Sequence, residues 1–360
     1  MPSLPHAVDD DVSSQVAAAS VSALVGSAAS GDLPTVQRLV GEGVPVDVSV
    51  VVDGALVDAV TAASKAGAMD VVQWLVNEDG GGGDVNKINA AGSTPLVVAA
   101  VHGHVSLVVW LLKTAKADVD KTIFRGFTAL MMCAMMGALD MVKILVRVGK
   151  ADVNKVNDAC WTPLYAAANT GHVDVIEWLV CAARARVGGH GLSPLLVAAQ
   201  NGHSDVVQWL VQRARADVNA TNARGATPLY LAAERGRVDM LRVLVRECRA
   251  DINKASFDGM TPLHIAAQNR HTDAIYWLAT EGKASINATD NDGATPLHIA
   301  AATRHSFAVV QTLVECGADV SIVDKHGDTP LRVAVTVKNM RVAEWLSVGG
   351  APGLPLRAEA

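Results

Sequence analysis

The amino-acid sequence predicts an all-α solenoid, in which one small helical unit is repeated along the chain. The triplet Thr-Pro-Leu returns at residues 94–96, 162–164, 227–229, 261–263, 295–297 and 329–331. Two near-matches, Thr128-Ala129-Leu130 and Ser193-Pro194-Leu195, fill the gaps, so that successive copies lie 34, 34, 31, 34, 34, 34 and 34 residues apart. A period in this range indicates an array of one supersecondary unit rather than a domain with a single core.

Composition and charge agree with such an array and exclude several classes of function. Half of the 360 residues are apolar but only 4% are aromatic, a balance that suits closely packed short helices. The net charge is −6, so there is no overall attraction to nucleic acid or to an anionic membrane. The most apolar stretch, residues 127–146, is interrupted by Asp140 and Lys143, and we therefore expect no membrane insertion.

Cysteine usage and the N-terminal segment both predict an intracellular protein. The five cysteines are scattered and form no Cys-x-x-Cys pair, which is typical of a reducing compartment; they are Cys133, Cys160, Cys181, Cys248 and Cys316. Residues 1–12 carry three aspartates and no basic segment, unlike a secretory signal. We expect the protein in the cytoplasm or the nucleus.

Each repeated unit is predicted to contain two short helices and a loop. In the third unit, Thr94 is suited to cap the first helix and Pro95 to occupy its first position. In most units an aspartate opens the second helix: Asp70, Asp140, Asp174, Asp205, Asp239 and Asp273. Ala-Asp-Val-Asn or a variant follows, then a polar turn with glycine such as residues 222–225, which together predict a hairpin-like finger.

This order of motifs, with Thr-Pro-Leu-His-Ile-Ala-Ala at residues 261–267 and 295–301, resembles the ankyrin repeat. The resemblance implies antiparallel helix pairs stacked into a right-handed, slightly curved solenoid, with β-hairpin-like fingers along one edge. About ten repeats are expected within residues 21–348. The first two and the last are divergent, and flexible tails are expected at residues 1–20 and 349–360.

The sequence departs from the family pattern at several places, and each departure predicts a local difference in structure. The period exceeds the usual 33 residues by one, and we expect the extra residue after the second helix, except in the ninth repeat, where it is expected near Ser306-Phe307. The finger near residues 188–190 is expected to be truncated. Arg270, Arg304 and Lys338 replace the glycine between the two helices. The last repeat is expected to present a polar end face, through Arg332, Lys338, Arg341 and Glu344.

For function, the resemblance implies a non-catalytic scaffold or adaptor that presents a concave surface to a partner protein. The alternative is a regulatory or substrate-receptor subunit of an enzyme complex whose catalytic chain is separate. In both cases the expected partner is another protein, and we expect no nucleic acid, no small-molecule substrate, no cofactor and no metal. The chain is expected to be monomeric.

No group of residues in the sequence has the asymmetry that a catalytic site needs. The serines, histidines, aspartates and cysteines each fall at a repeated position or in a turn. Cys133 replaces an alanine of a first helix and is expected to be buried, whereas Cys160 takes the glycine position of its finger. The glycine run at residues 80–83 lacks the Lys-Ser/Thr that follows in a phosphate-binding loop. The sequence therefore predicts that the chain is not an enzyme.

Histidine and tryptophan also recur, and structural roles are expected for both. One histidine recurs after the first helix: His104, His172, His203, His271 and His305. Neighbouring repeats lie about 8–10 Å apart, so histidines at equivalent positions are too far apart to bind one metal ion. In the family this histidine ties the loop between the helices. His264 and His298 are given the same interpretation. Six tryptophans share one position of the second helix: Trp74, Trp110, Trp178, Trp209, Trp277 and Trp345. We expect a row of core anchors; the alternative is an exposed row that contacts a partner.

One Lys or Arg per repeat just after the second helix forms a basic ladder: Lys116, Lys150, Arg184, Arg215, Arg249 and Lys283. One interpretation is structural, because cations at helix C-termini are favoured by the dipole. Aspartates two residues further on would then neutralise most of them: Asp118, Asp152, Asp217 and Asp251. The other interpretation is a stripe that steers an acidic partner.

The fourth repeat, which opens at Thr128, departs most from the pattern. In the family, partner contacts come mostly from the finger tips and the end of the first helix. Here these positions and the adjacent finger hold Phe124, Arg125, Phe127, Met135, Met136 and Trp161. Equivalent helix positions elsewhere are polar, such as Glu234-Arg235. Either this is an adaptable apolar docking patch, or the side chains fold back to close the array.

The finger asparagines Asn154, Asn219, Asn253 and Asn287 are expected to hydrogen-bond within their own turns.

Overall fold

The computed structural model describes residues 9–52, 55–77, 82–188 and 193–348. The chain divides into two compact units. The N-terminal unit comprises Met1–Ala167 and Asp174–Arg186, and the C-terminal unit comprises Ala168–Val173 and Val187–Ala360.

The described residues form helix pairs, as the sequence predicts. The first helices are α1 (Asp9–Ser30), α3 (Ala59–Ala66), α5 (Pro95–Val101), α7 (Ala129–Met135), α9 (Pro163–Thr170), α11 (Pro194–Asn201), α13 (Pro228–Glu234), α15 (Pro262–Gln268), α17 (Pro296–Ala302) and α19 (Pro330–Thr336). The second helices are α2 (Leu33–Gly41), α4 (Met69–Val76), α6 (Val105–Lys113), α8 (Leu139–Arg147), α10 (Val173–Cys181), α12 (Ser204–Gln212), α14 (Val238–Arg242), α16 (Thr272–Thr280), α18 (Phe307–Glu315) and α20 (Met340–Ser347). A π-helical segment, η3 (Val243–Glu247), continues α14.

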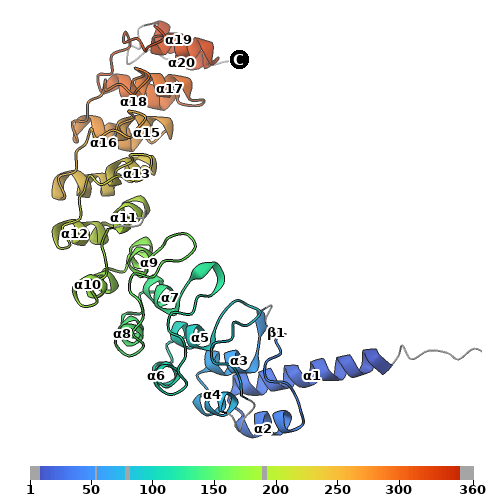
Figure 1. Cartoon of the computed structure of the whole chain (residues 1–360). Helices are drawn as coiled ribbons and strands as arrows, with labels where there is room; N and C mark the ends of the chain where they lie inside the picture. The colour runs from blue at the N-terminus through green and yellow to red at the C-terminus, as the bar shows by residue number, and fades with distance from the viewer. Residues whose placement is uncertain (1–8, 53–54, 78–81, 189–192, 349–360) are drawn as a thin grey trace, which may run out of the picture. The chain divides into compact units, whose positions relative to one another are not determined.

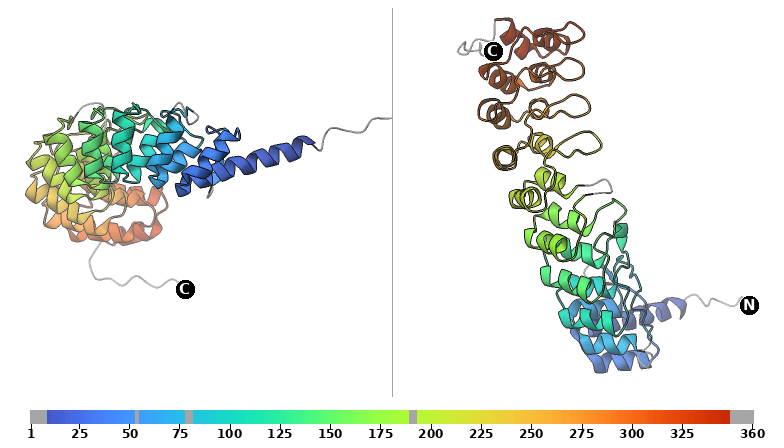
Figure 2. Two further views of the ribbon diagram at one scale, coloured as in Figure 1. Left: turned by 90° about the horizontal axis from the view of Figure 1, so that it is seen from below. Right: turned by 60° about the vertical axis from the view of Figure 1, so that its left-hand side comes forward.

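Within each unit the helices form two layers. In the N-terminal unit α1, α3, α5 and α7 contact one another in succession, and α2 with α4 and α6 with α8 belong to the second layer (Figure 1). In the C-terminal unit α11, α13, α15, α17 and α19 form the first layer, and α14, α16, α18 and α20 contact in succession in the second. The loops of the C-terminal unit leave the same side of successive helix pairs (Figure 2, right).

The Thr-Pro-Leu triplet begins the first helices as its chemistry predicts. The Thr227 hydroxyl accepts a hydrogen bond from the Tyr230 N–H at 3.1 Å, with Pro228 at the first helical position. Thr128, whose triplet lacks proline, still caps α7 through the Met131 N–H at 3.3 Å. The triplet leucines other than Leu331 are buried. Small residues that follow them are buried too, such as Ala232 and Ala233 after Leu229, which lets neighbouring first helices approach closely.

The fingers are closed as narrow hairpins. We number each finger by the repeat that it opens. In the second finger, β1 (Val50–Val52) and β2 (Ala55–Val57) pair antiparallel, with Val50 opposite Val57. Later finger tips within the described residues are closed by a backbone hydrogen bond, such as Asn157 N–H to Trp161 C=O at 3.1 Å and Ser256 N–H to Met260 C=O at 2.9 Å. A short 3-10 turn, η2 (Phe124–Gly126), forms the tip of the fourth finger.

Histidines tie several repeats to the one before them. Nε2 of His104 lies 2.8 Å from the Lys65 carbonyl, and Nε2 of His271 lies 3.0 Å from the Glu234 carbonyl. Arg237 replaces histidine in one repeat and donates from Nε to the Gln200 carbonyl at 2.9 Å. His305 does not belong to this set. It occupies the position of the left-handed glycine, with a φ of 57°, and the buried Ser306 takes the histidine position at the start of α18.

The extra residue of the ninth repeat therefore lies before His305 rather than near Ser306-Phe307. Arg270 and Lys338 have left-handed φ values of 64° and 60°, nine residues after the threonines Thr261 and Thr329. His305 lies ten residues after Thr295. His305, and not Arg304, thus replaces the glycine between the helices.

The finger asparagines join neighbouring repeats instead of closing their own turns. Oδ1 of Asn154 accepts from the Arg186 N–H, and Oδ1 of Asn253 accepts from the Ser285 N–H, both at 2.9 Å. Asn219 and Asn287 do the same with Asp251 and Asp319. The sequence-based expectation was wrong because a turn asparagine can satisfy a backbone donor of the next repeat once the two fingers lie side by side.

The ends of the chain differ in part from expectation. Residues 9–20, predicted as part of a flexible tail, belong to α1, while residues 1–8, 349–360, Gly80, Gly81, Gly189 and His190 lie outside the described residues. The last repeat exposes Val335, Val337 and Met340 beside its charged residues, so its end face is only partly polar.

The recurring tryptophans are not all core residues. Trp277 and Trp345 are buried, but four others are half-buried: Trp74, Trp110, Trp178 and Trp209.

Candidate partner-binding surfaces

A cleft lies between the fourth and fifth fingers in the N-terminal unit, and we call it the repeat-four cleft. It has a volume of about 250 Å³ and is lined by Arg125, Phe127, Asn157, Asp158, Ala159 and Trp161. The rings of Phe127 and Trp161 meet edge to face with centroids 6.0 Å apart, and Trp161 lies 4.9 Å from Tyr165. Such ring pairs stabilise one another beyond the area that they bury. The cleft therefore has a preformed aromatic wall.

Backbone conformation brings the two fingers together. Arg125 and Gly126 have left-handed φ values of 59° and 73°, which turn the Arg125 carbonyl toward the fifth finger, where it accepts from the Asp158 N–H at 3.3 Å. A Cβ on Gly126 would lie 2.6 Å from Oδ1 of Asp158, so the close approach requires glycine. Oδ1 of Asn157 accepts from the Trp161 N–H at 2.9 Å and fixes the turn that carries the indole.

The structure separates the six residues predicted for this patch. Phe124 is 68% exposed at the finger tip, where the Arg125 guanidinium lies 5.1 Å from its ring centroid. Phe127 and Trp161 are half-buried against each other, so part of the patch packs within the array and part faces solvent. Met135 is the last residue of α7 and Met136 is its C-cap. Neither residue lines the cleft, and Met136 is 49% exposed.

Sequence reasoning missed several residues that matter here. Asn157, Asp158 and Ala159 line the cleft, and their only sequence signal is that they precede Trp161 in the same finger. Phe257, at the position equivalent to Phe124, is 69% exposed in the C-terminal unit; an aromatic residue in a polar turn was the available signal.

The basic ladder occupies a strained backbone position. All six residues have left-handed φ values between 56° and 62°, and all six are exposed. Glycine fills the same position in the first, second and ninth repeats, as Gly43, Gly82 and Gly317. A left-handed conformation costs a residue with a side chain roughly 1–2 kcal/mol, whereas a cation near a helix C-terminus gains roughly 0.3–1 kcal/mol. The dipole alone therefore does not explain why cations replace glycine.

The aspartates that follow the ladder do not pair with it. Oδ1 of Asp152 accepts from the Asn154 N–H at 2.9 Å, and Oδ1 of Asp251 accepts from the Asn253 N–H at 3.0 Å. Asp118 and Asp217 make the same bond within their own turns. Within the described ranges, no ladder side chain forms an ion pair. These aspartates lie near the ladder without forming a direct ion pair with it, and local neutralisation of the ladder charge stays a prediction.

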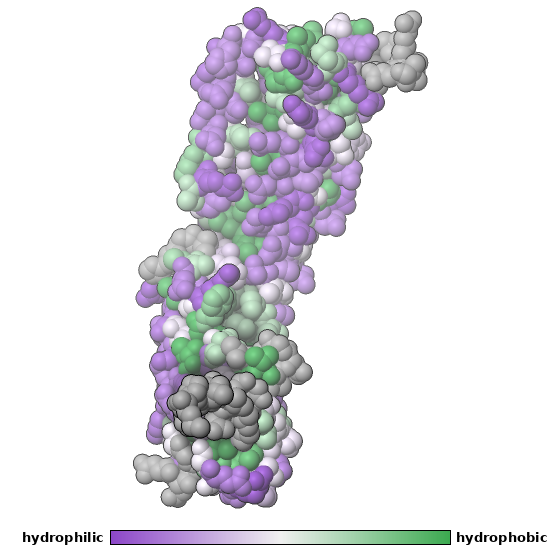
Figure 3. Space-filling view, turned by 90° about the vertical axis from the view of Figure 1, so that its right-hand side faces the viewer, coloured by the Kyte–Doolittle hydropathy of each residue, from purple (hydrophilic) through white to green (hydrophobic). Residues whose placement is uncertain are grey.

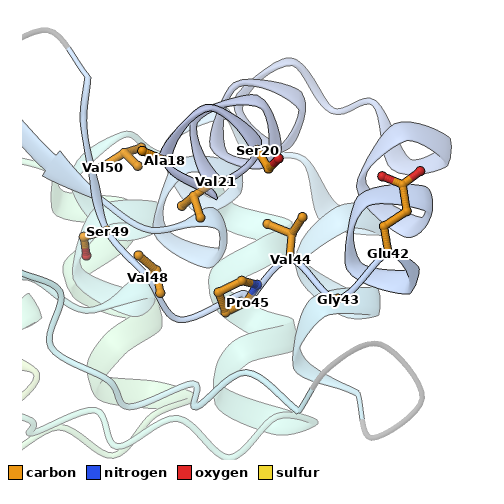
Figure 4. Close-up of a pocket in the computed structure, with 10 residues that line it drawn as sticks. All are labelled: Ala18, Ser20, Val21, Glu42, Gly43, Val44, Pro45, Val48, Ser49 and Val50. Atoms are coloured by element: carbon orange, nitrogen blue, oxygen red, sulfur yellow. The ribbon is translucent and has the colours of Figure 1, made fainter. Parts of the chain in front are cut away.

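A second hollow lies at the start of the N-terminal unit, between α1 and the second finger (Figure 4). It has a volume of about 420 Å³, and its apolar lining includes Val21, Val44, Pro45, Val48 and Val50. Val48 is 43% exposed. Figure 3 shows one face of the molecule, on which hydrophobic residues gather in patches among hydrophilic ones.

Neither a metal-binding cluster nor a membrane-spanning helix is found among the described residues. In that part of the chain, no group of three or more His, Cys, Asp and Glu side chains is placed to hold a metal ion. No helix there is both long and apolar enough to cross a bilayer.

Comparison with protein families agrees with the helix pairs, fingers and histidine ties. The model of ankyrin repeats matches residues 24–123, 116–189, 195–290, 244–324 and 282–351. The chain belongs to the ankyrin repeat family, whose members are generally modules for protein–protein interaction and typically lack catalytic activity. A search of the curated proteins finds no match to this chain.

Proposed function

We propose that this chain is a non-catalytic adaptor whose repeat-four cleft captures an apolar side chain of a partner protein. The observation that carries the proposal is the aromatic cleft of Phe127 and Trp161 between two fingers. The positions equivalent to Phe127 and Trp161 in the other repeats hold no aromatic residue, for example Ala226 and Asp328, so the fold does not require an aromatic wall here. A small pocket lined by Trp and Arg has the composition of an interface hot spot.

The charged residues at the rim of the cleft support a partner segment that binds in one orientation. An apolar side chain that fills the cleft would contribute about 1.5–3 kcal/mol by burial. Arg125 on one side and Asp158 on the other offer opposite charges, which would orient the partner segment. Because the cleft is already formed, little ordering is needed when the partner binds.

A random peptide library displayed on phage tests the proposal. We expect selection on the wild-type protein to enrich peptides with one large apolar residue, and these peptides to lose binding to Phe127→Ala/Trp161→Ala. Phe257→Ala is the matched control, because it removes a finger-tip aromatic ring of the other unit. Arg125→Glu is a second variant that removes no buried contact, since Arg125 is exposed.

The outcome that contradicts the proposal is equally definite. If the selected peptides bind the double variant as well as the wild type, the cleft is not the capture site. Circular dichroism melts of each variant show whether the array is intact. If the double variant is unfolded, binding of the selected peptides to Arg125→Glu tests the cleft in its place, and unchanged binding would contradict the proposal.

A further inference from the structure

The basic ladder has a feature that neither the fold nor the repeat-four cleft requires. Its position tolerates glycine without strain, as Gly43 and Gly317 show with φ values of 88° and 93°. Six consecutive repeats nonetheless place Lys or Arg there in the left-handed conformation. Strained backbone that is kept at equivalent positions is a reason to look for a function.

The ladder cations are available to a partner. Lys116, Lys150 and Arg184 belong to the N-terminal unit, and Arg215, Arg249 and Lys283 belong to the C-terminal unit. All six are exposed. Other surface cations have acidic neighbours, for example Arg38 with Glu42 and Arg246 with Glu281, each at 2.6 Å. In the described part of the chain no ladder cation forms an ion pair with an acidic side chain.

We propose that the basic ladder docks an extended acidic segment of a partner protein, with one carboxylate for each repeat. Neighbouring repeats are spaced by about 8–10 Å, the distance between packed helices. An extended chain advances about 3.3 Å per residue, so three residues span one repeat. Each unit therefore selects a segment with Asp or Glu at every third position, and three such residues match its three cations.

The aspartates of the same turns favour a peptide over a nucleic acid. Asp118, Asp152 and Asp251 are exposed two residues after a ladder cation, so the two signs of charge alternate along the loops. A phosphate backbone carries charge continuously and would meet these carboxylates. A peptide with neutral residues between its carboxylates avoids them.

A labelled peptide made of the repeated triplet Glu-Gly-Ser is the probe, and fluorescence anisotropy measures its binding. The comparison peptide has the same composition with the glutamates placed together. We expect the spaced peptide to bind the wild type more tightly, and its affinity to fall when salt is raised from about 0.05 to 0.3 M. Neither peptide has an apolar anchor, so the repeat-four cleft is not tested by this probe.

Glycine variants separate binding from stability. Lys116→Gly/Lys150→Gly/Arg184→Gly is expected to weaken binding about tenfold or more in the N-terminal unit while the melting temperature rises or holds, because the strain is relieved. Arg215→Gly/Arg249→Gly/Lys283→Gly makes the same test in the C-terminal unit. The matched control is Lys113→Gln/Lys121→Gln/Lys155→Gln, which removes equal charge outside the ladder and is expected to bind almost as the wild type does.

Three outcomes would overturn the proposal. They are equal affinity for the spaced and clustered peptides, equal loss of binding in the glutamine control, and tighter binding of a single-stranded RNA oligonucleotide than of the spaced peptide. Phe127→Ala/Trp161→Ala should leave binding of this probe unchanged, so failure of the cleft and failure of the ladder are distinguishable.

Discussion

Single polar residues in the fingers determine how neighbouring repeats are joined. At most of the joining positions an asparagine oxygen accepts a backbone N–H of the next repeat, but in the fourth finger the acceptor is Asp120, whose two carboxylate oxygens lie 3.1 and 3.2 Å from the Asp152 nitrogen. Burial raises the pKa of Asp120 above its ordinary value of 3.8, and the nearby Asp152 and Asp118 add to the rise. Its ionised form is thus less favourable in the folded chain than in the unfolded chain.

Asp120→Asn is therefore expected to stabilise the protein. The amide keeps the acceptor and removes the charge, so the free energy of unfolding at pH 7 should rise by no more than about 1 kcal/mol, since the site is partly screened by solvent. The sign follows from linkage: the penalty is complete above the folded pKa and disappears as the pH falls toward 3.8. Urea titrations at several pH values measure the gain. Asn154→Asp is the control with the opposite sign, and a gain independent of pH would refute the explanation.

The cysteines should differ sharply in reactivity. Cys133 is buried, and burial raises the pKa of its thiol to about 12; burial also raises the pKa of Cys248 and of Cys316. Cys160 and Cys181 are exposed. Because the thiolate is the reactive form, iodoacetamide at pH 8 should label Cys160 and Cys181 first, and Cys133 only after unfolding. Mass spectrometry of the peptides measures the order, and early labelling of Cys133 would show that its helix is open.

At the scale of elements, two histidines join a first helix to the next finger. Nδ1 of His264 accepts from the Thr261 N–H at 3.1 Å, and Nε2 lies 3.0 Å from the Ala294 carbonyl. His298 repeats this arrangement with Thr295 and Asp328. The geometry needs a neutral ring with its proton on Nε2, because a protonated Nδ1 cannot accept a hydrogen bond.

Stability of the C-terminal unit should consequently fall in mild acid. Burial lowers the pKa of His264 below 6.5, so its contribution is complete above pH 6.5 and is lost as the pH falls through the folded pKa. His264→Gln is expected to cost about 1 kcal/mol at pH 7.5 and to reduce the slope of stability between pH 7.5 and 5.5. Denaturant titrations measure both slopes, and identical slopes would contradict the role given to His264.

The sequence predicted the helices whose formation depends on residues close together in the chain. A threonine cap, a proline at the first helical position and small buried residues suffice to predict a first helix such as α13. The N-terminal part of α1 was missed because residues 9–20 hold no such triplet. The asparagine bridges were missed because their donor lies in another repeat, and the position of His305 was missed because an insertion shifts the pattern without changing the 34-residue period.

At the scale of the whole molecule, the residues that follow the repeat pattern form the ankyrin array, and residues that depart from it line the candidate binding surfaces. The sequence predicted Arg125, Phe127 and Trp161 as one patch, and the structure brings them to one cleft. It could not predict that Asp158 lines the cleft, because the approach of the fingers depends on left-handed turns at Arg125 and Gly126. Nor did it predict that the ladder is strained and unpaired, since this depends on backbone angles and on hydrogen bonds that occupy the neighbouring aspartates.

Calorimetric titration of a library-selected peptide measures directly whether a partner binds at the repeat-four cleft. We expect Phe127→Ala/Trp161→Ala to weaken binding about a hundredfold or more, as happens when interface anchors are removed, and Phe257→Ala to bind the peptide with the affinity of the wild type. Equal affinities for the wild type and a folded double variant would contradict binding at this cleft.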